Sequence, residues 1–327
     1  MKVGFCVVNY SEVPVKDVVE LAARKGYEAV ELPTYTDNGQ VDVDELLKNG
    51  GAGARALRKM VEDTGLFISG LSNHADSPLI LGPHGRDLAS VCDGTKEEQI
   101  RFGQQSMIKS AQLASELEVP AVVAFSGVGN FGHFNDWPYP AGWAEEEAAF
   151  CENWIPVFDK FKEYGVKVAF EPHPNNIIYD IHTTKRCLDL CNGHESFAIN
   201  FDPANIAYTG IDLGAYINEF GDRIVLVHAK DCEFVSHNMP RGGYWMLQRD
   251  WGERDRSFRF RIPGWGSINW KSIITELYLN GYDGVFAYEH EDVTMSRADG
   301  VDKTIEFLKP LMIHAPYEGR NDKLFQR

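Results

Sequence analysis

The strongest constraint on the fold of this 327-residue chain is a repeated alternation between short apolar runs and longer amphipathic stretches. Runs of β-branched and apolar residues, which are typical of buried strands, occur at 3–8, 29–32, 66–71, 121–125, 166–170, 198–201, 224–228 and 284–288. Amphipathic stretches typical of helices follow them at 15–25, 52–64, 95–117, 145–164, 184–192, 213–220, 270–280 and 296–311. Strands and helices in this order predict an α/β fold with a parallel sheet. The count of eight favours a closed (β/α)₈ TIM barrel over an open doubly wound sheet.

Two of the predicted loops are too long to be plain connections between a strand and a helix. Residues 126–143 follow the fourth strand, and residues 232–266 follow the seventh. Both leave the carboxyl ends of strands, which is the face where barrel enzymes carry their active sites. Because no linker divides the chain, we expect a single domain over residues 1–327, with an insertion at about 232–262 over the active-site face.

The charge balance narrows the classes of partner. The chain carries 48 acidic and 32 basic side chains, a formal net charge of −16, whereas nucleic-acid binding needs a basic surface. No apolar stretch approaches the roughly 20 residues that span a bilayer, and the N-terminus lacks the features of a signal peptide. Six scattered cysteines without a CxxC pair are typical of buried thiols in a reducing compartment. We therefore expect a cytoplasmic protein with no nucleic-acid or membrane partner.

Four polar residues stand at the ends of four consecutive predicted strands. Glu171 ends the fifth strand, Asp202 the sixth, His228 the seventh and Glu289 the eighth. In a closed barrel the ends of adjacent strands lie side by side, so these side chains can converge on one point. One carboxylate at a strand end is usually a solvated loop residue or a helix cap, but four such residues in succession predict a metal site. An oxygen-rich set with one imidazole suits Mn²⁺, Mg²⁺, Co²⁺ or Zn²⁺.

Five motifs lie along the second half of the chain, four of them around these positions. They are Phe-Glu-Pro-His-Pro (170–174), Asn-Phe-Asp-Pro-Ala-Asn (200–205), Val-His-Ala-Lys-Asp (227–231), Ile-Pro-Gly-Trp-Gly (262–266) and Ala-Tyr-Glu-His-Glu-Asp (287–292). Together they resemble the xylose-isomerase-like sugar phosphate isomerase/epimerase superfamily, and the resemblance covers nearly the whole chain. It implies that Glu171, Asp202, His228 and Glu289 bind one divalent metal ion, most often manganese. It also implies that Glu171 and Glu289 act as the acid and the base.

Two features depart from the pattern of the ketose 3-epimerases in this superfamily. Those enzymes typically carry a histidine three residues after the aspartate ligand, where this chain has Asn205. The interval between His228 and Glu289 is also long, because of the insertion after Asp231. Both departures put the function of a simple free-ketose epimerase in doubt.

The ligand set indicates a reaction that begins with loss of a proton next to a carbonyl group. A metal ion on the carbonyl oxygen acts as a Lewis acid and stabilises the enediolate that this loss produces. A carboxylate at the metal keeps one oxygen free to take the proton. Two carboxylates on opposite sides of the substrate can invert the carbon, as in an epimerase, whereas a leaving group in the β position makes the enzyme a lyase.

Further candidate residues surround the predicted metal site. His133, in the long loop after the fourth strand, is a candidate second acid or base. His74 at the end of the third strand, and His173 two residues after Glu171, are candidate substrate contacts, as is Asn205. Lys230 can hydrogen-bond substrate, although an ion pair beside the metal is an equal alternative. The superfamily often places a substrate-binding arginine after the metal histidine, and Arg261 is our candidate for it.

These observations favour a divalent-metal-dependent isomerase or epimerase that acts on a keto sugar or a derivative of one. The alternative is a 3-keto-glycoside lyase or dehydratase, which resembles the catalytic subunit of C-glycoside deglycosidases. We expect a homo-oligomer in the first case and a small partner subunit in the second. A nuclease is disfavoured by the acidic charge, and a barrel that only binds a sugar is the remaining class.

Overall fold

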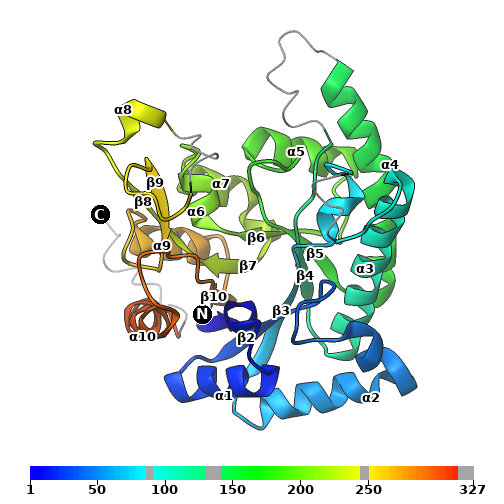
Figure 1. Ribbon diagram of the computed structural model, residues 1–327, viewed down its shortest axis with the longest axis horizontal. Coiled ribbons are helices and arrows are strands. Elements are labelled where there is room, and N and C mark those ends of the chain that lie inside the picture. The colour runs from blue at the N-terminus through cyan, green and yellow to red at the C-terminus, as the bar shows by residue number, and fades with distance from the viewer. Residues whose placement is uncertain (86–90, 130–140, 244–249, 316–327) are drawn as a thin grey trace, which may run out of the picture.

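Eight parallel strands close into a barrel in the computed structural model of the chain, which describes residues 1–85, 91–129, 141–243 and 250–315 (Figure 1). Each strand pairs with its neighbours in sequence, and β1 pairs with β10 to complete the ring. The strands are β1 (Lys2–Cys6), β2 (Ala29–Pro33), β3 (Phe67–Asn73), β4 (Ala121–Ala124), β5 (Lys167–Phe170), β6 (Phe197–Phe201), β7 (Ile224–Ala229) and β10 (Val285–Tyr288). The predicted TIM barrel is therefore confirmed.

Helices alternate with these strands and pack around the ring (Figure 1). They are α1 (Val15–Lys25), α2 (Val43–Glu62), α3 (Lys96–Glu116), α4 (Ala141–Tyr164), α5 (Ile181–Leu190), α7 (Leu213–Phe220), α9 (Trp270–Leu279) and α10 (Arg297–Leu308). The predicted helix at 52–64 begins earlier, because a short turn of α2 precedes a break at residues 48–51. Asn49, Gly50 and Gly51 all have positive φ there, which interrupts the helix.

Several short helical elements complete the described chain. Two of them closely follow strands β1 and β6, at the end of the barrel where the predicted metal ligands stand. These elements are η1 (Val7–Tyr10), η2 (Ser77–Ile80), α6 (Pro203–Ala207), η4 (Gly221–Arg223), α8 (Met239–Gly242) and η5 (Lys309–Leu311). Among the described residues, no helix combines the length and the apolar composition that a bilayer crossing requires.

Small side chains fill the interior of the barrel below the site. Ala121, Val123, Ala169 and Leu226 form a separate buried cluster, whereas the larger apolar side chains gather between the strands and the helices. A Cβ added to Gly70 of β3 would lie 2.8 Å from Cδ1 of Leu226, so a larger residue there would displace the Leu226 side chain. This close packing fixes how the strands stand relative to one another and therefore where their carboxyl ends lie.

Helix α4 holds the carboxyl end of β5 through one buried indole. The Trp154 side chain is fully buried, and its ring lies edge-on to Phe170 with 4.7 Å between the ring centroids. Its Nε1 donates a hydrogen bond of 3.0 Å to the carbonyl oxygen of Ser126. The indole therefore ties the segment after β4 to the residue that precedes Glu171.

The segment after β7 contains a hairpin, which sequence analysis predicted only as a long loop. Strand β8 (Asp231–Phe234) pairs antiparallel with β9 (Phe258–Arg261), in the register Cys232 with Phe260. Phe258 stacks on Tyr208, which directly follows α6, at 4.3 Å between ring centroids. The hairpin thus packs beside α6, near the carboxyl ends of β6 and β7 (Figure 1).

One buried carboxylate anchors this hairpin to the barrel. Asp231 is fully buried and accepts hydrogen bonds from Nε1 of Trp270 at 2.8 Å and from the backbone N–H groups of three residues. Those N–H groups belong to Cys232, Gly264 and Ile268, at 2.7, 2.9 and 3.1 Å. Four donors on one buried acceptor make the start of the hairpin rigid, directly beside Lys230.

Replacing Asp231 with alanine should therefore cost about 3 kcal/mol or more, because it leaves several buried donors without a partner. Asp212 provides the control, since its side chain accepts a single hydrogen bond from Ala215 N as an ordinary helix cap. Its replacement by alanine should cost about 1 kcal/mol. Urea unfolding of both variants measures the difference, and equal losses would contradict the anchoring role of Asp231.

Candidate active site

The four predicted metal ligands converge at the carboxyl ends of four strands that are consecutive around the barrel. Glu171, Asp202 and Glu289 directly follow β5, β6 and β10, and His228 lies in β7. Each residue offers one ligand atom, and these atoms all lie within 4.8 Å of one another. Three of the side chains are almost fully buried, whereas that of Glu289 is 16% exposed. The group therefore opens toward solvent on the side of Glu289.

The carboxylate of Glu31 fixes the orientation of the His228 imidazole from the side away from the other ligands. Nε2 of His228 lies 3.1 and 3.2 Å from the two carboxylate oxygens of Glu31. Since a carboxylate accepts and does not donate, Nε2 carries a hydrogen, so Nδ1 is the nitrogen that can release its proton to bind a metal ion. Nδ1 lies 2.9 Å from Oε2 of Glu171 but forms no hydrogen bond within the described part of the chain. It is oriented as a metal-binding histidine nitrogen is.

Two irregularities in the barrel direct polar side chains into this site. The register shifts between Val30 and Glu31 in the pairing of β2 with β3, and between Ile199 and Asn200 in the pairing of β6 with β7. Such bulges turn a side chain away from the regular alternation. Glu31 then reaches His228, and Asn200 donates a hydrogen bond of 2.9 Å to Oε2 of Glu171.

Asn205 joins two of the ligands. Its Nδ2 donates to Oε1 of Glu171 at 2.7 Å and lies 3.1 Å from Oδ2 of Asp202. Asp202 in turn begins α6, where its Oδ1 accepts hydrogen bonds from the backbone N–H groups of Ala204 and Asn205. Asn205 is therefore placed at the ligands, and its contact with substrate stays a prediction.

Lys230 lies against three carboxylates. Its Nζ is 2.8 Å from Asp202, 3.0 Å from Glu289 and 3.0 Å from Glu291. Burial alone would lower the pKa of Lys230, but these carboxylates outweigh burial and raise it well above its usual range. The ring of Phe260 in the hairpin packs over the ammonium at 4.8 Å. Lys230 therefore stays charged.

The neighbouring charges also shift the pKa values of the ligands themselves. Burial opposes ionisation of Glu171 and Glu289, but His228 beside both, with Lys230 beside Glu289, outweighs burial and lowers the pKa of each carboxyl. Burial also opposes a charge on His228, yet Glu31 and the other carboxylates raise the pKa of its imidazole well above the usual value. The carboxylates that hold a proton on His228 also favour a cation. The ligand atoms lie within 4.8 Å of one another, close to the roughly 4.4 Å that two atoms around one ion can span, so small side-chain movements would bring them onto a divalent metal.

Three rings form a wall beside the ligands. Phe125, which follows β4, lies 4.7 Å from the ring of His74 and 5.1 Å from that of His173, between centroids. Nε2 of His74 lies 3.2 Å from Oε2 of Glu171. Nδ1 of His173 lies 2.6 Å from the carbonyl oxygen of Pro174, so it carries the hydrogen and leaves Nε2 as an acceptor. Burial lowers the pKa of His173, which keeps this imidazole neutral.

Two other predicted residues are not found among the contacts of the ligands, one of them because it lies outside the described residues. Arg261 lies on β9, where its guanidinium pairs with Asp292 and Glu233, each at 2.8 Å. Within the described residues, none of its hydrogen bonds or ion pairs reaches the four ligands. His133 lies outside the described residues. The roles assigned to Arg261 and His133 therefore remain predictions.

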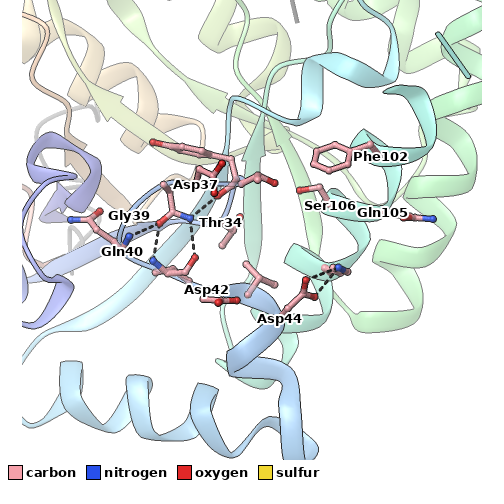
Figure 2. Close-up of a pocket in the computed structure, with 15 residues that line it drawn as sticks. Thr34, Asp37, Gly39, Gln40, Asp42, Asp44, Phe102, Gln105 and Ser106 are labelled. Atoms are coloured by element: carbon pink, nitrogen blue, oxygen red, sulfur yellow. Dashed lines mark hydrogen bonds and ion pairs between the residues drawn. The ribbon is translucent and has the colours of Figure 1, made fainter. Parts of the chain in front are cut away.

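A separate hollow of about 690 Å³ lies between the loop after β2 and helix α3 (Figure 2). Figure 2 shows Asp37 and Gln40 on the loop side and Phe102 and Ser106 on the helix side. None of the four candidate ligands lines it. Its wall instead supports the active site, because buried Asp76 accepts hydrogen bonds from Thr36 and Ser106 that hold the segment just after His74.

Sequence analysis missed Glu31, Asn200, Phe125 and Glu291 as members of the site. Glu31 and Asn200 carried a usable signal, because each is a polar residue inside an otherwise apolar strand of the barrel. Asn200 also stands two residues before Asp202, and side chains two positions apart on a strand share a face. Phe125 and Glu291 carry no comparable signal, since apolar residues and exposed carboxylates are common in any sequence.

Sequence comparison identifies related chains. Residues 19–311 match the profile of the family described as xylose isomerase-like TIM barrel. The uncharacterized protein YfiH of Bacillus subtilis is 23% identical over 327 residues, which cover 94% of this chain and 98% of that protein. An inosose dehydratase of Clostridium perfringens is 26% identical over 131 residues, or 40% of this chain and 42% of that enzyme.

Solved structures share the barrel at low sequence identity. The probable 3-DHS dehydratase AsbF of Bacillus anthracis aligns with a TM-score of 0.66 at 19% identity, over 94% of this chain and 99% of that one. The IolI protein with a binding zinc atom aligns with a TM-score of 0.65 at 17% identity, over 95% and 98% of the two chains. A D-tagatose 3-epimerase-like protein gives 0.65 at 17%, over 95% and 97%. These likenesses show the fold.

The contact between Glu31 and His228 predicts a measurable effect on metal affinity. Replacing Glu31 with glutamine removes the charged acceptor of Nε2 and should lower the affinity for Mn²⁺ or Zn²⁺ about 10- to 100-fold. Glu62 serves as the control, because its carboxylate pairs with Arg58 on the surface of α2. Titration against a competing chelator measures both variants, and equal affinities for the two would contradict this role for Glu31.

Proposed function

The chain belongs to the xylose isomerase-like TIM barrel family, and on that premise we propose that it is a divalent-metal-dependent isomerase or epimerase. It abstracts the proton next to the carbonyl group of a keto sugar or keto polyol. The observation that carries this proposal is the convergence of Glu171, Asp202, His228 and Glu289 within 4.8 Å at the carboxyl ends of the strands. Barrel enzymes carry their chemistry at this face.

Those four residues would hold one metal ion, and manganese is our first choice for it. The zinc atom in the related IolI structure makes zinc the second. A bound divalent ion supplies a Lewis acid that makes the proton beside the substrate carbonyl more acidic. The side chains of the protein would transfer the protons and orient the substrate.

Glu289 is the proposed base. It is the most exposed of the four ligands, and Lys230 and His228 keep it ionised. A carboxylate that is charged and reachable can take the substrate proton. Glu171 faces it across His228 and would return a proton on the opposite side of the carbon, which gives the epimer. The wall made by His74, Phe125 and His173 would orient the sugar through its rings and polar edges.

Elimination of water or of an aglycone from a keto sugar is the second candidate. The hydrogen bonds that Asn205 and Asn200 donate to the two oxygens of Glu171 weaken this carboxylate as a second base, which favours chemistry with one base. Glu289 would take the α-proton, the electron pair would form the double bond, and the C–O bond at the β carbon would break. His74, whose Nε2 lies 3.2 Å from Glu171, would give the departing oxygen a proton. The match to an inosose dehydratase supports this alternative.

Replacing Glu289 with glutamine should reduce turnover at least about 1,000-fold, because glutamine has no basic oxygen for the proton. The comparison variant is Glu276→Gln on the outer helix α9, which should keep full activity. The assay is loss of the α-proton signal by NMR in D₂O, with the protein loaded with Mn²⁺ and a chelated sample beside it. Full activity of the Glu289 variant would overturn its assignment as the base.

The same assay separates the two candidates when it includes ketoses, keto-inositols and 3-keto-glycosides. An epimer that accumulates identifies an epimerase, and release of water or aglycone identifies a lyase. We also propose that the protein works as a homo-oligomer. Turnover by the purified chain alone would support this assembly, whereas a requirement for a second polypeptide would support the lyase with a partner subunit.

A further inference from the structure

We propose that the active site selects an uncharged polyhydroxylated ketone, and that Glu291 determines this preference by neutralising Lys230. The inference rests on the proposed function, because it names the substrate class of the same site. It concerns a residue that lies outside the four ligands. Glu291 follows β10 by three positions and its side chain is 43% exposed, so it stands on the solvent side of Lys230.

The first argument is the position of the ammonium group. The Lys230 side chain is only 4% exposed, and its Nζ contacts Asp202 and Glu289 on its inner side. Glu291 supplies a third carboxylate at 3.0 Å and is the most exposed of these partners. The three carboxylates neutralise the ammonium group of Lys230. It therefore does not attract a phosphate or carboxylate group on a substrate.

The second argument is the charge of the whole site. With a divalent ion bound through a neutral His228, the carboxylates of Glu171, Asp202, Glu289 and Glu291 would carry four negative charges, whereas Lys230 carries one positive charge. A divalent ion on the ligands still leaves the group negative, and Glu31 beside His228 adds to the same sign. A substrate with its own negative charge would enter against this field, which a neutral polyol would not experience.

The third argument concerns the two arginines of β9. Arg261 pairs with Asp292 and Glu233, and Arg259 lies 3.8 Å from Glu233 while it donates to the carbonyl oxygen of Arg254. In the part of the hairpin that the structure describes, both arginines are therefore engaged with acceptors of the protein. The formal net charge of −16 over the whole chain extends the same repulsion to longer range.

The test compares pairs of ligands that differ only by a phosphate group, such as D-ribulose with D-ribulose 5-phosphate and D-fructose with D-fructose 6-phosphate. Calorimetry on the Mn²⁺-loaded protein gives Kd for each, apart from any turnover. We expect the neutral member to bind at least about tenfold more tightly. Repulsion between the phosphate group and the carboxylates of the site is large enough to produce a difference of this size. Raising the salt concentration should narrow this difference, since mobile ions screen exposed charges.

The variant Glu291→Gln should reduce the ratio of the Kd of the phosphorylated ligand to the Kd of the neutral ligand about fivefold or more. The reason is that Lys230, without Glu291, can attract the phosphate group. Glu219→Gln is the matched control, since it removes a carboxylate of similar exposure, 38%, that pairs with Lys185 between the outer helices α7 and α5. The control should leave the ratio unchanged. Thermal unfolding of both variants establishes that they are folded.

Equal or tighter binding of the phosphorylated members by the wild-type protein would overturn the inference, as would binding of neither member of any pair. An unchanged ratio in Glu291→Gln would remove Glu291 from its proposed role. Failure of the proposed reaction is a different result, because it is measured as absence of α-proton exchange by a protein that binds the neutral ligand.

Discussion

The crowding of like charges at one end of the barrel is the constraint around which the rest of the site is organised. Closing eight parallel strands brings the ends of β5, β6, β7 and β10 together, and the sequence places a carboxylate at three of them. Carboxylates this close and this deeply buried repel one another strongly unless positive charge lies between them. Before an ion binds, His228 and Lys230, which stand two positions apart on one strand and its extension, supply that charge from the protein side. A divalent ion would replace the proton on His228 and supply the positive charge in its place.

The polar groups behind the ligands show how the fold tolerates this arrangement. Glu31, Asn200 and Asn205 each reach a ligand with a hydrogen bond, and two of them do so at a register shift in the barrel. Glu171, Asp202 and His228 are thus each held by a neighbour whose own position is fixed by strand pairing or by a helix start. The ligand geometry is therefore present before any ion binds, which reduces the entropy cost of binding.

The alternation of apolar runs was sufficient to predict every strand of the barrel, because a strand buried on both faces leaves a continuous apolar segment. Strand ends were sufficient to bring Glu171, Asp202, His228 and Glu289 together, since closure makes sequence neighbours into spatial neighbours. The hairpin of β8 and β9 was not predicted, because its pairing depends on contacts with Tyr208 and Trp270 that lie far away in sequence. The pairing of Arg261 with Asp292 depends on that hairpin and was missed for the same reason.

The anchoring of the hairpin at Asp231 has a consequence for how proteins with this barrel diverge. The anchor lies between the residues that hold the ligands and the residues that form the hairpin, and its hydrogen bonds end at the base of the hairpin. Substitutions, insertions and deletions beyond that base can accumulate without disturbing β7 or the groups it carries. The hairpin is therefore the part of the molecule where descendants of one ancestor can acquire different substrates while they keep the same inherited chemistry.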